Sequence, residues 1–167
     1  MIKKLILAAF GGTFLSLCGA QVPLAIPFKE DPPIMVDGDI SDWDVVKAPI
    51  ILNEKHQLLD KNIDRSRYKG AKDLSAVIKT AWRDYGFFIM IKVTDDVHNQ
   101  QFTGKDIWRG DHIELFLDTI PAAKTPGNKL STGQFHIMLS PGNFANIKPD
   151  VVCFSPSGLT LQGVKIE

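Results

Sequence analysis

Short stretches in which apolar and polar residues alternate, or apolar residues run together, follow one another along most of the chain. A period of two is typical of strands with one buried face, and short apolar runs bounded by turn residues are typical of buried strands. No stretch repeats apolar residues at helical spacing over several turns. The pattern predicts strands over 34–36, 49–52, 75–82, 87–93, 112–118, 134–140, 151–154 and 159–166.

The clearest pair of strands is the hairpin over 75–82 and 87–93. In its first strand Ile78 belongs to one face and Ala81 to the other. The segment 83–86 fits a tight turn, with Gly86 where a positive φ would favour glycine. The second strand is apolar on both faces, so we expect it near the centre of its sheet.

Seven or so short strands separated by polar turns predict an all-β fold, an antiparallel β-sandwich of immunoglobulin-like or jelly-roll-like architecture. A proline-rich lead-in over 21–32 precedes this domain, which we place at 33–167. Residues 53–73 are polar and irregular and are expected to form a surface excursion. The chain stops within the predicted strand 159–166, so we expect the domain to lack its last strands.

The composition is that of one folded, soluble domain. The chain has 167 residues, of which 44% are hydrophobic and 23% charged, with 19 acidic and 19 basic side chains. A nearly neutral surface offers no electrostatic reason to bind nucleic acid. Nucleic acid is therefore excluded as a partner.

The N-terminus has the order of a secretory signal. Two lysines, an apolar run over 5–17 and small residues up to Ala20 follow one another, which predicts a signal peptide over 1–20. The apolar run is shorter than the roughly twenty residues that a membrane-spanning helix needs, so no transmembrane span is expected. The protein is predicted to be exported, to the periplasm, the extracellular space or the outer membrane.

Cys18 leaves two ways of processing this signal. Residues 15–18 resemble a bacterial lipoprotein box, but Leu17 stands where that box has a small residue. Cleavage after Ala20 with soluble release is preferred, and a lipid anchor at Cys18 is the alternative. In either form Cys153 has no internal disulfide partner other than Cys18, so the core must hold the fold.

Trp108 is the first candidate binding residue. It lies between charged residues and Gly110, outside any predicted strand. An exposed indole suits the apolar face of a sugar ring, which stacks on aromatic surfaces. The alternative is a loop tryptophan that folds back onto the edge of the domain.

Polar side chains on two predicted strands are the second candidate set. Glu114 lies opposite the apolar face of 112–118, and Gln134 and His136 lie opposite that of 134–140. If the two strands are neighbours, the three side chains converge. A carboxylate, an amide and an imidazole suit sugar hydroxyls, which both donate and accept hydrogen bonds. The alternative is an ordinary solvated strand face.

Four aspartates are weak candidates for a structural calcium site: Asp37, Asp39, Asp95 and Asp96. Their carboxylates are suitable ligands, but their spacing does not match a twelve-residue calcium loop. The alternative role for them is turn formation. No catalytic motif was found, because the chain has no serine elbow, phosphate-binding glycine loop or Cys-His pair.

Three segments resemble the family-nine carbohydrate-binding modules, a family related to the DOMON-like β-sandwiches. They are PIMVDGDISDW at 33–43, WRDYGFF at 82–88 with VTDD at 93–96, and WRGDHIELFLD at 108–118 followed by QFH at 134–136. Their order and spacing make the match more specific than any one segment does.

The resemblance implies a non-catalytic, sugar-binding β-sandwich that serves extracellular or periplasmic polysaccharide breakdown, as an accessory domain of a glycoside hydrolase. It implies that Trp108 stacks on the sugar and that Glu114, Gln134 and His136 contact its hydroxyls. His136 stands where the family usually has arginine. The family's second stacking tryptophan would lie beyond residue 167, and Trp43 and Trp82 would be core residues.

Two other functions remain open. DOMON-like relatives bind haem, and Met90, Met138 and His136 are candidate axial ligands of a non-covalent electron-transfer haem. A hydrolase would need two suitably spaced carboxyl groups. No such pair stands out, so we expect no enzyme activity.

Overall fold

The structure is a computed structural model that describes residues 4–8, 26–47, 49–57, 64–120, 130–159 and 166. It divides into two compact units. One comprises 98–167 together with 1–20, and the other comprises 21–97. Each unit contains one β-sheet, and the two are described in turn below.

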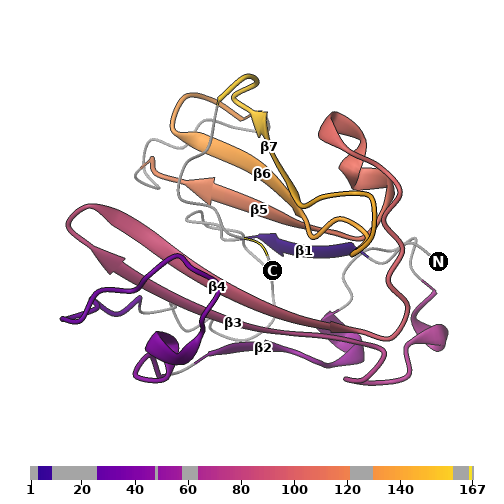
Figure 1. Cartoon of the computed structure of the whole chain (residues 1–167), viewed down its shortest axis with the longest axis horizontal. Coiled ribbons are helices and arrows are strands. Elements are labelled where there is room, and N and C mark those ends of the chain that lie inside the picture. Colours follow the sequence, from indigo (N-terminus) through magenta and orange to yellow (C-terminus); the bar gives the residue numbers. More distant parts are fainter. Residues whose placement is uncertain are drawn as a thin grey trace, which may run out of the picture. The chain divides into compact units, whose positions relative to one another are not determined.

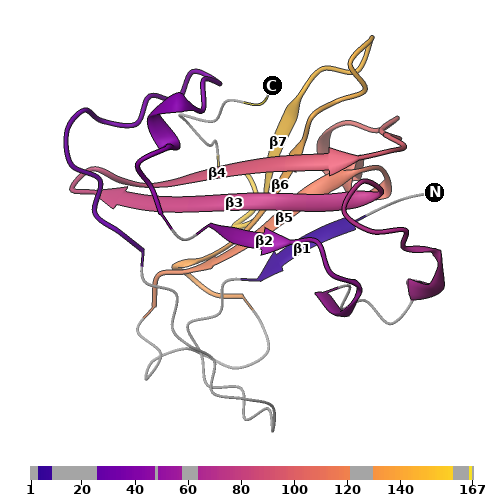
Figure 2. The ribbon, with the colours of Figure 1, turned by 90° about the horizontal axis from the view of Figure 1, so that it is seen from below.

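The unit 21–97 is built on a three-stranded antiparallel sheet with the order β2-β3-β4 (Figure 2). Its strands are β2 (Ile50–Leu52), β3 (Leu74–Arg83) and β4 (Gly86–Asp95). The long strands pair from Leu74 opposite Asp95 to Arg83 opposite Gly86, which leaves a two-residue turn. The predicted hairpin is confirmed.

Two details of the hairpin prediction are wrong. Gly86 does not have a positive φ, because it is the first residue of β4 and pairs with Arg83. β4 lies at the edge of the described sheet, and β3 is its centre. Phe88 packs against a buried core cluster, whereas Phe87 and Val93 on the other face are 44% and 41% exposed. Apolar residues on both faces therefore do not make this strand the central one.

The predicted strand over 34–36 is also wrong. Ile34 is buried in the cluster with Trp43, Val46 and Ala81. The N–H of Met35 donates to Asp42 Oδ2 at 2.7 Å, so a side chain takes the place of a neighbouring strand. Asp42 lies in the short 3₁₀ helix η1 (Ser41–Trp43). Residues 34–36 are therefore held by local turns and do not form an edge strand of the sheet.

The two tryptophans expected in the core differ. Trp43 is buried, as expected, but Trp82 is 44% exposed. Trp82 lies near the hairpin end, where Phe28 forms an isolated bridge with it and contacts its ring edge-on at 4.8 Å. Phe28 covers only part of the indole, because it is itself 45% exposed.

The excursion expected over 53–73 contains two short 3₁₀ helices, η2 (Lys55–Gln57) and η3 (Arg65–Arg67). The hydroxyl of Tyr68 donates to the carbonyl of Asn53 at 2.6 Å and lies 3.2 Å from that of Leu74. Tyr68 thereby anchors the excursion to the start of β3.

The unit containing 98–167 is a four-stranded sheet with the order β1-β5-β6-β7 (Figure 1). Its antiparallel strands are β5 (His112–Asp118), β6 (Gln134–Ser140) and β7 (Asp150–Ser155). β1 (Lys4–Ala8) pairs with β5 in parallel, from Lys4 opposite His112 to Ala8 opposite Phe116. The 3₁₀ helix η4 (Gly104–Arg109) precedes β5 and contacts β6 and β7.

The pairing of β6 with β7 is irregular at His136. Ile137 pairs with Cys153 whereas His136 pairs with Ser155, which leaves Phe154 as an extra residue in β7. A bulge of this kind bends a strand and redirects a side chain. Phe154 accordingly lies near the His136 ring, at a centroid distance of 5.4 Å.

The predicted all-β class is confirmed. The structure has the two sheets that a β-sandwich requires, antiparallel apart from β1, and only short 3₁₀ helices in the described residues. The predicted strand 159–166 lies outside those residues except at its two ends, and the predicted signal peptide over 1–20 lies outside them except for Lys4–Ala8. No helix among them has the length and apolarity of a membrane span.

Gly142 and Gly158 allow a test of the loop after β6. Both have a positive φ, 71° and 85°, but a Cβ on Gly142 would lie 2.1 Å from the carbonyl oxygen of Ile147, whereas Gly158 has open space. Gly158→Ala should cost about 1–2 kcal/mol of unfolding free energy through backbone strain alone. Gly142→Ala should cost clearly more in urea unfolding, and equal losses would contradict the close packing of this loop.

Candidate functional site

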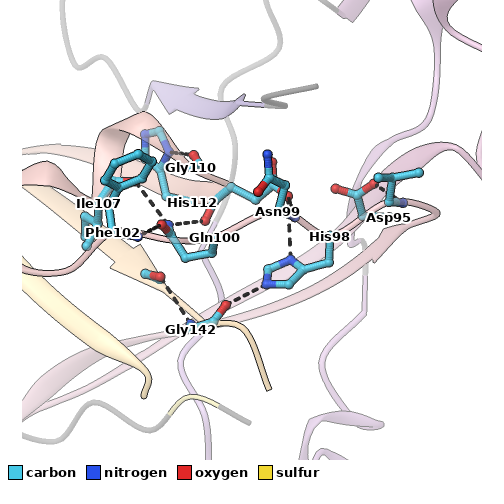
Figure 3. A network of polar contacts seen from close by, with 12 residues as sticks. Asp95, His98, Asn99, Gln100, Phe102, Ile107, Gly110, His112 and Gly142 are labelled. Carbon is cyan, nitrogen blue, oxygen red and sulfur yellow. Dashed lines mark hydrogen bonds and ion pairs between the residues drawn. The ribbon is translucent and has the colours of Figure 1, made fainter. Parts of the chain in front are cut away.

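A buried amide organises the loop that carries Trp108. Gln100 is fully buried, and its Nε2 donates to the carbonyls of Ile107 and Asp111 at 3.1 and 2.9 Å. Its Oε1 accepts from the N–H of Phe102 at 2.8 Å (Figure 3). One side chain thus satisfies backbone groups before, within and after η4, which buried polar groups require.

A second contact joins this loop to the loop after β6. His98 contacts the carbonyl of Gly142 through Nε2, at 2.5 Å, and its Nδ1 lies 3.6 Å from Asp111 Oδ2 (Figure 3). The same carboxylate oxygen accepts from the N–H of Asn99. The start of the segment before η4 is therefore tied both to the loop after β6 and to Asp111.

Trp108 lies near the end of η4 and is 45% exposed. Its neighbour Ile107 is fully buried and anchors the helix. Arg109 lies over the ring of Phe102, with 4.4 Å from its guanidinium carbon to the ring centroid. The indole is therefore presented at the surface of an anchored helix rather than folded wholly into the core.

Glu114 lies between two imidazole rings on the sheet. Its Oε1 is 2.9 Å from Nε2 of His112, and its Oε2 is 3.4 Å from Nε2 of His136. The side chain is only 14% exposed. The hydrogen bond with His112 is the main reason why the pKa of Glu114 lies below its ordinary value of 4.5, and it outweighs the opposing effect of burial.

His136 is enclosed by aromatic rings. It stacks on Phe116, its pairing partner on β5, at 4.2 Å and an interplanar angle of 17°, and Phe154 contacts it at 55°. Its Nε2 is buried and has no hydrogen-bond partner among the residues that the structure describes. The 3.4 Å contact between this nitrogen and Glu114 Oε2 therefore lacks the geometry of a hydrogen bond.

Gln134 does not join Glu114 and His136. Its Nε2 donates to Asp118 Oδ2 at 2.8 Å, and its Oε1 accepts from the N–H of Ser131 at 3.0 Å. The residue is buried and fixes the approach to β6. The predicted neighbour relation of the two strands is confirmed, but only two of the three predicted side chains converge.

The strand face that carries these groups is not a solvated one. His112, Gln134, Met138 and Ser140 belong to it, and all are less than 9% exposed. The ordinary solvated face considered from the sequence is therefore wrong. Alternation in the sequence showed which side chains share a face, but did not show that both faces are covered.

The aspartates considered for calcium form turns. Asp37 Oδ1 accepts the N–H of Asp39, Asp39 Oδ1 accepts that of Ser41, and Asp95 Oδ1 accepts that of Val97. Calcium takes six to eight oxygen ligands. No group of three or more acidic, histidine or cysteine side chains that could hold a metal ion is found in the described ranges. The structural calcium site stays a prediction.

An all-β domain with an exposed indole and a buried carboxylate–imidazole pair has the features of a binding module. The chain belongs to the carbohydrate family 9 binding domain-like family, whose model matches residues 51–161. The resemblance seen in the sequence is thereby confirmed, and with it carbohydrate as the general class of ligand and a non-catalytic family. Neither the curated proteins nor the solved structures contain a significant match.

The sequence did not indicate that Gln100 organises the loop or that His112 binds Glu114. Gln100 gave no signal, because an isolated glutamine in a loop has no pattern that indicates burial. His112 had a weak signal, since it lies two residues before Glu114 on the same strand face. Its burial and its hydrogen bond to Glu114 came only with the structure.

Replacing Gln100 should loosen the loop that carries Trp108. Gln100→Ala removes hydrogen bonds from three backbone groups in a buried region and should cost about 3 kcal/mol of unfolding free energy. Gln101→Ala, at an exposed neighbour, is the matched control and should cost less than about 0.5 kcal/mol. Urea unfolding monitored by tryptophan fluorescence measures both, and similar values would contradict the role of this amide.

Glu114 should contribute to stability in a pH-dependent way. Because its pKa is lowered in the folded state, its contribution is fully present above the ordinary value of 4.5 and is lost as pH falls through the folded-state pKa. The difference in unfolding free energy between the parent and Glu114→Gln should therefore shrink as the pH is lowered from 7 towards acid. Glu54→Gln, at an exposed position, is the control. A difference that is constant over this range would contradict the contact with His112.

Proposed function

We propose that this domain is an exported, non-catalytic module that binds a sugar by stacking it on Trp108 and hydrogen-bonding it through Glu114 and His136. The module would serve polysaccharide breakdown outside the cytoplasm. Carbohydrate as the class of ligand follows from the family, and the residues, the export and the biological role are the proposal.

The observation that carries the proposal is the unused hydrogen-bonding capacity beside Glu114. Nε2 of His136 is a buried polar atom without a hydrogen-bond partner in the described part of the chain. Such an atom costs free energy, which a ligand hydroxyl would offset. Glu114, with its lowered pKa, is ionised at neutral pH, and an ionised acceptor forms stronger hydrogen bonds than a neutral one.

A path for the ligand is needed, because His136 Nε2 is buried. Phe154 is suited to provide it: the ring is 49% exposed, lies in the bulge of β7 and contacts His136. Rotation of this ring away from His136 would open the imidazole to a hydroxyl group. Trp108, nearly half exposed, would supply the stacking surface that sugars use.

Export is supported by the charged, apolar and small-residue order of 1–20. Release after Ala20 is preferred to a lipid anchor at Cys18. The structure pairs Lys4–Ala8 with β5, so a cleaved protein would present this edge of β5 without β1.

Calorimetry of the intact chain with cello- and xylo-oligosaccharides tests the proposal. Stacking and hydroxyl hydrogen bonds should give favourable heat and micromolar to millimolar affinity, about −8 to −4 kcal/mol. Trp108→Ala should abolish the heat. Trp82→Ala, which removes an equally exposed indole from the other unit, should leave the affinity unchanged.

The same titration decides the alternatives. A folded Trp108→Ala protein that binds as tightly as the parent would overturn the proposed site. Added calcium that changes neither affinity nor melting temperature would argue against a structural ion. A Soret band in the purified protein would favour the haem function.

A further inference from the structure

Both ring nitrogens of His112 face oxygen atoms. Its side chain is completely buried. Nδ1 contacts the carbonyl oxygen of Gly110 (Figure 3). The distance is 2.8 Å, and Nε2 lies 2.9 Å from Glu114 Oε1. A carbonyl oxygen only accepts hydrogen bonds, so Nδ1 must carry a proton.

The second contact then requires another proton. A neutral imidazole carries one N–H, and here that hydrogen is already on Nδ1. Without a further proton, a nitrogen lone pair would face the carboxylate at 2.9 Å, and two acceptors repel each other. A carboxyl group of ordinary acidity is ionised at neutral pH, so the shared proton belongs to Nε2 of His112.

We propose that His112 is a buried imidazolium that positions Glu114 for sugar binding. It holds Oε1 through a charge-assisted hydrogen bond and so turns Oε2 towards His136, where it can accept from a hydroxyl group. This inference rests on the proposed function, because the sugar is the partner assigned to Oε2. His112 is a positioning residue, since it acts through Glu114.

The connection also reaches the loop that carries Trp108. The carbonyl of Gly110 binds His112, and the N–H of Gly110 donates to the carbonyl of Ile107 at 3.2 Å, which closes η4. The end of η4 and the carboxylate of Glu114 are therefore joined through one imidazole. A substitution of His112 should therefore alter the position of the Glu114 carboxylate and also that of the helix end that carries Trp108.

The protonation state can be measured without any ligand. Nitrogen-15 NMR of the histidine rings in the intact protein at pH 7 should show both nitrogens of His112 protonated, with assignment from the spectrum of a His112→Gln variant. One protonated and one unprotonated nitrogen would overturn the inference. Because no sugar is present, this result is independent of whether the proposed function holds.

Two variants separate positioning from simple space filling. The amide of His112→Gln replaces Nε2 as a donor to Glu114, whereas the shorter amide of His112→Asn replaces Nδ1 and reaches only Gly110. In calorimetry with the oligosaccharide that the parent binds, His112→Asn should lose about tenfold or more in affinity, as expected for a lost hydrogen bond to a charged group. His112→Gln should stay within about threefold of the parent.

Melting temperatures establish that both variants are folded. Equal affinities of the two variants, whether retained or lost, would overturn the positioning role. If His112→Asn does not fold, the NMR measurement on the parent still decides the inference. If the parent itself binds no sugar, the proposed function fails, and the NMR spectrum alone shows whether His112 is an imidazolium.

Discussion

The hydrogen bonds of the Gln100 amide are the constraint on which the geometry of the site depends. Backbone carbonyls at Ile107 and Asp111 lie where water does not satisfy them, and this amide binds both. Gly110 is required between them, because a Cβ there would lie 2.3 Å from Gln100 Oε1. The close approach directs the carbonyl of Gly110 to His112, and the loop is thereby tied to β5.

The sheet supplies the other half of the arrangement. Antiparallel pairing places Phe116 opposite His136, so Glu114 and His136 share one face of two neighbouring strands. The bulge in β7 then adds Phe154 to the same group. A carboxylate–imidazole pair whose imidazole is enclosed by aromatic rings is held more rigidly than one on an open strand, and a sugar site benefits because little ordering remains to be done on binding.

The sequence predicted the strands correctly where the alternation of apolar and polar residues alone determines them. Alternation predicted β5 and β6 with the observed bounds, since each has one aliphatic face and one mixed face. It failed for β4, because Phe87 and Val93 on one of its apolar faces are partly exposed, as an edge strand allows. The strand predicted over 34–36 is absent because the N–H of Met35 donates to the carboxylate of Asp42 instead of to a neighbouring strand. Glu114 and His136 were found from their shared face, but Gln100 and the buried role of His112 depend on contacts between distant segments.

The aromatic rings around His136 make the proton NMR signals of this imidazole sensitive to its surroundings. A ring stacked at 4.2 Å and nearly parallel to Phe116 experiences the magnetic shielding above an aromatic face. The carbon-bound protons of His136 should therefore resonate upfield, apart from those of the other histidines among the four in the chain. Their frequency depends on where Phe154 lies, so a displacement of this ring by a ligand can be followed in an unlabelled sample.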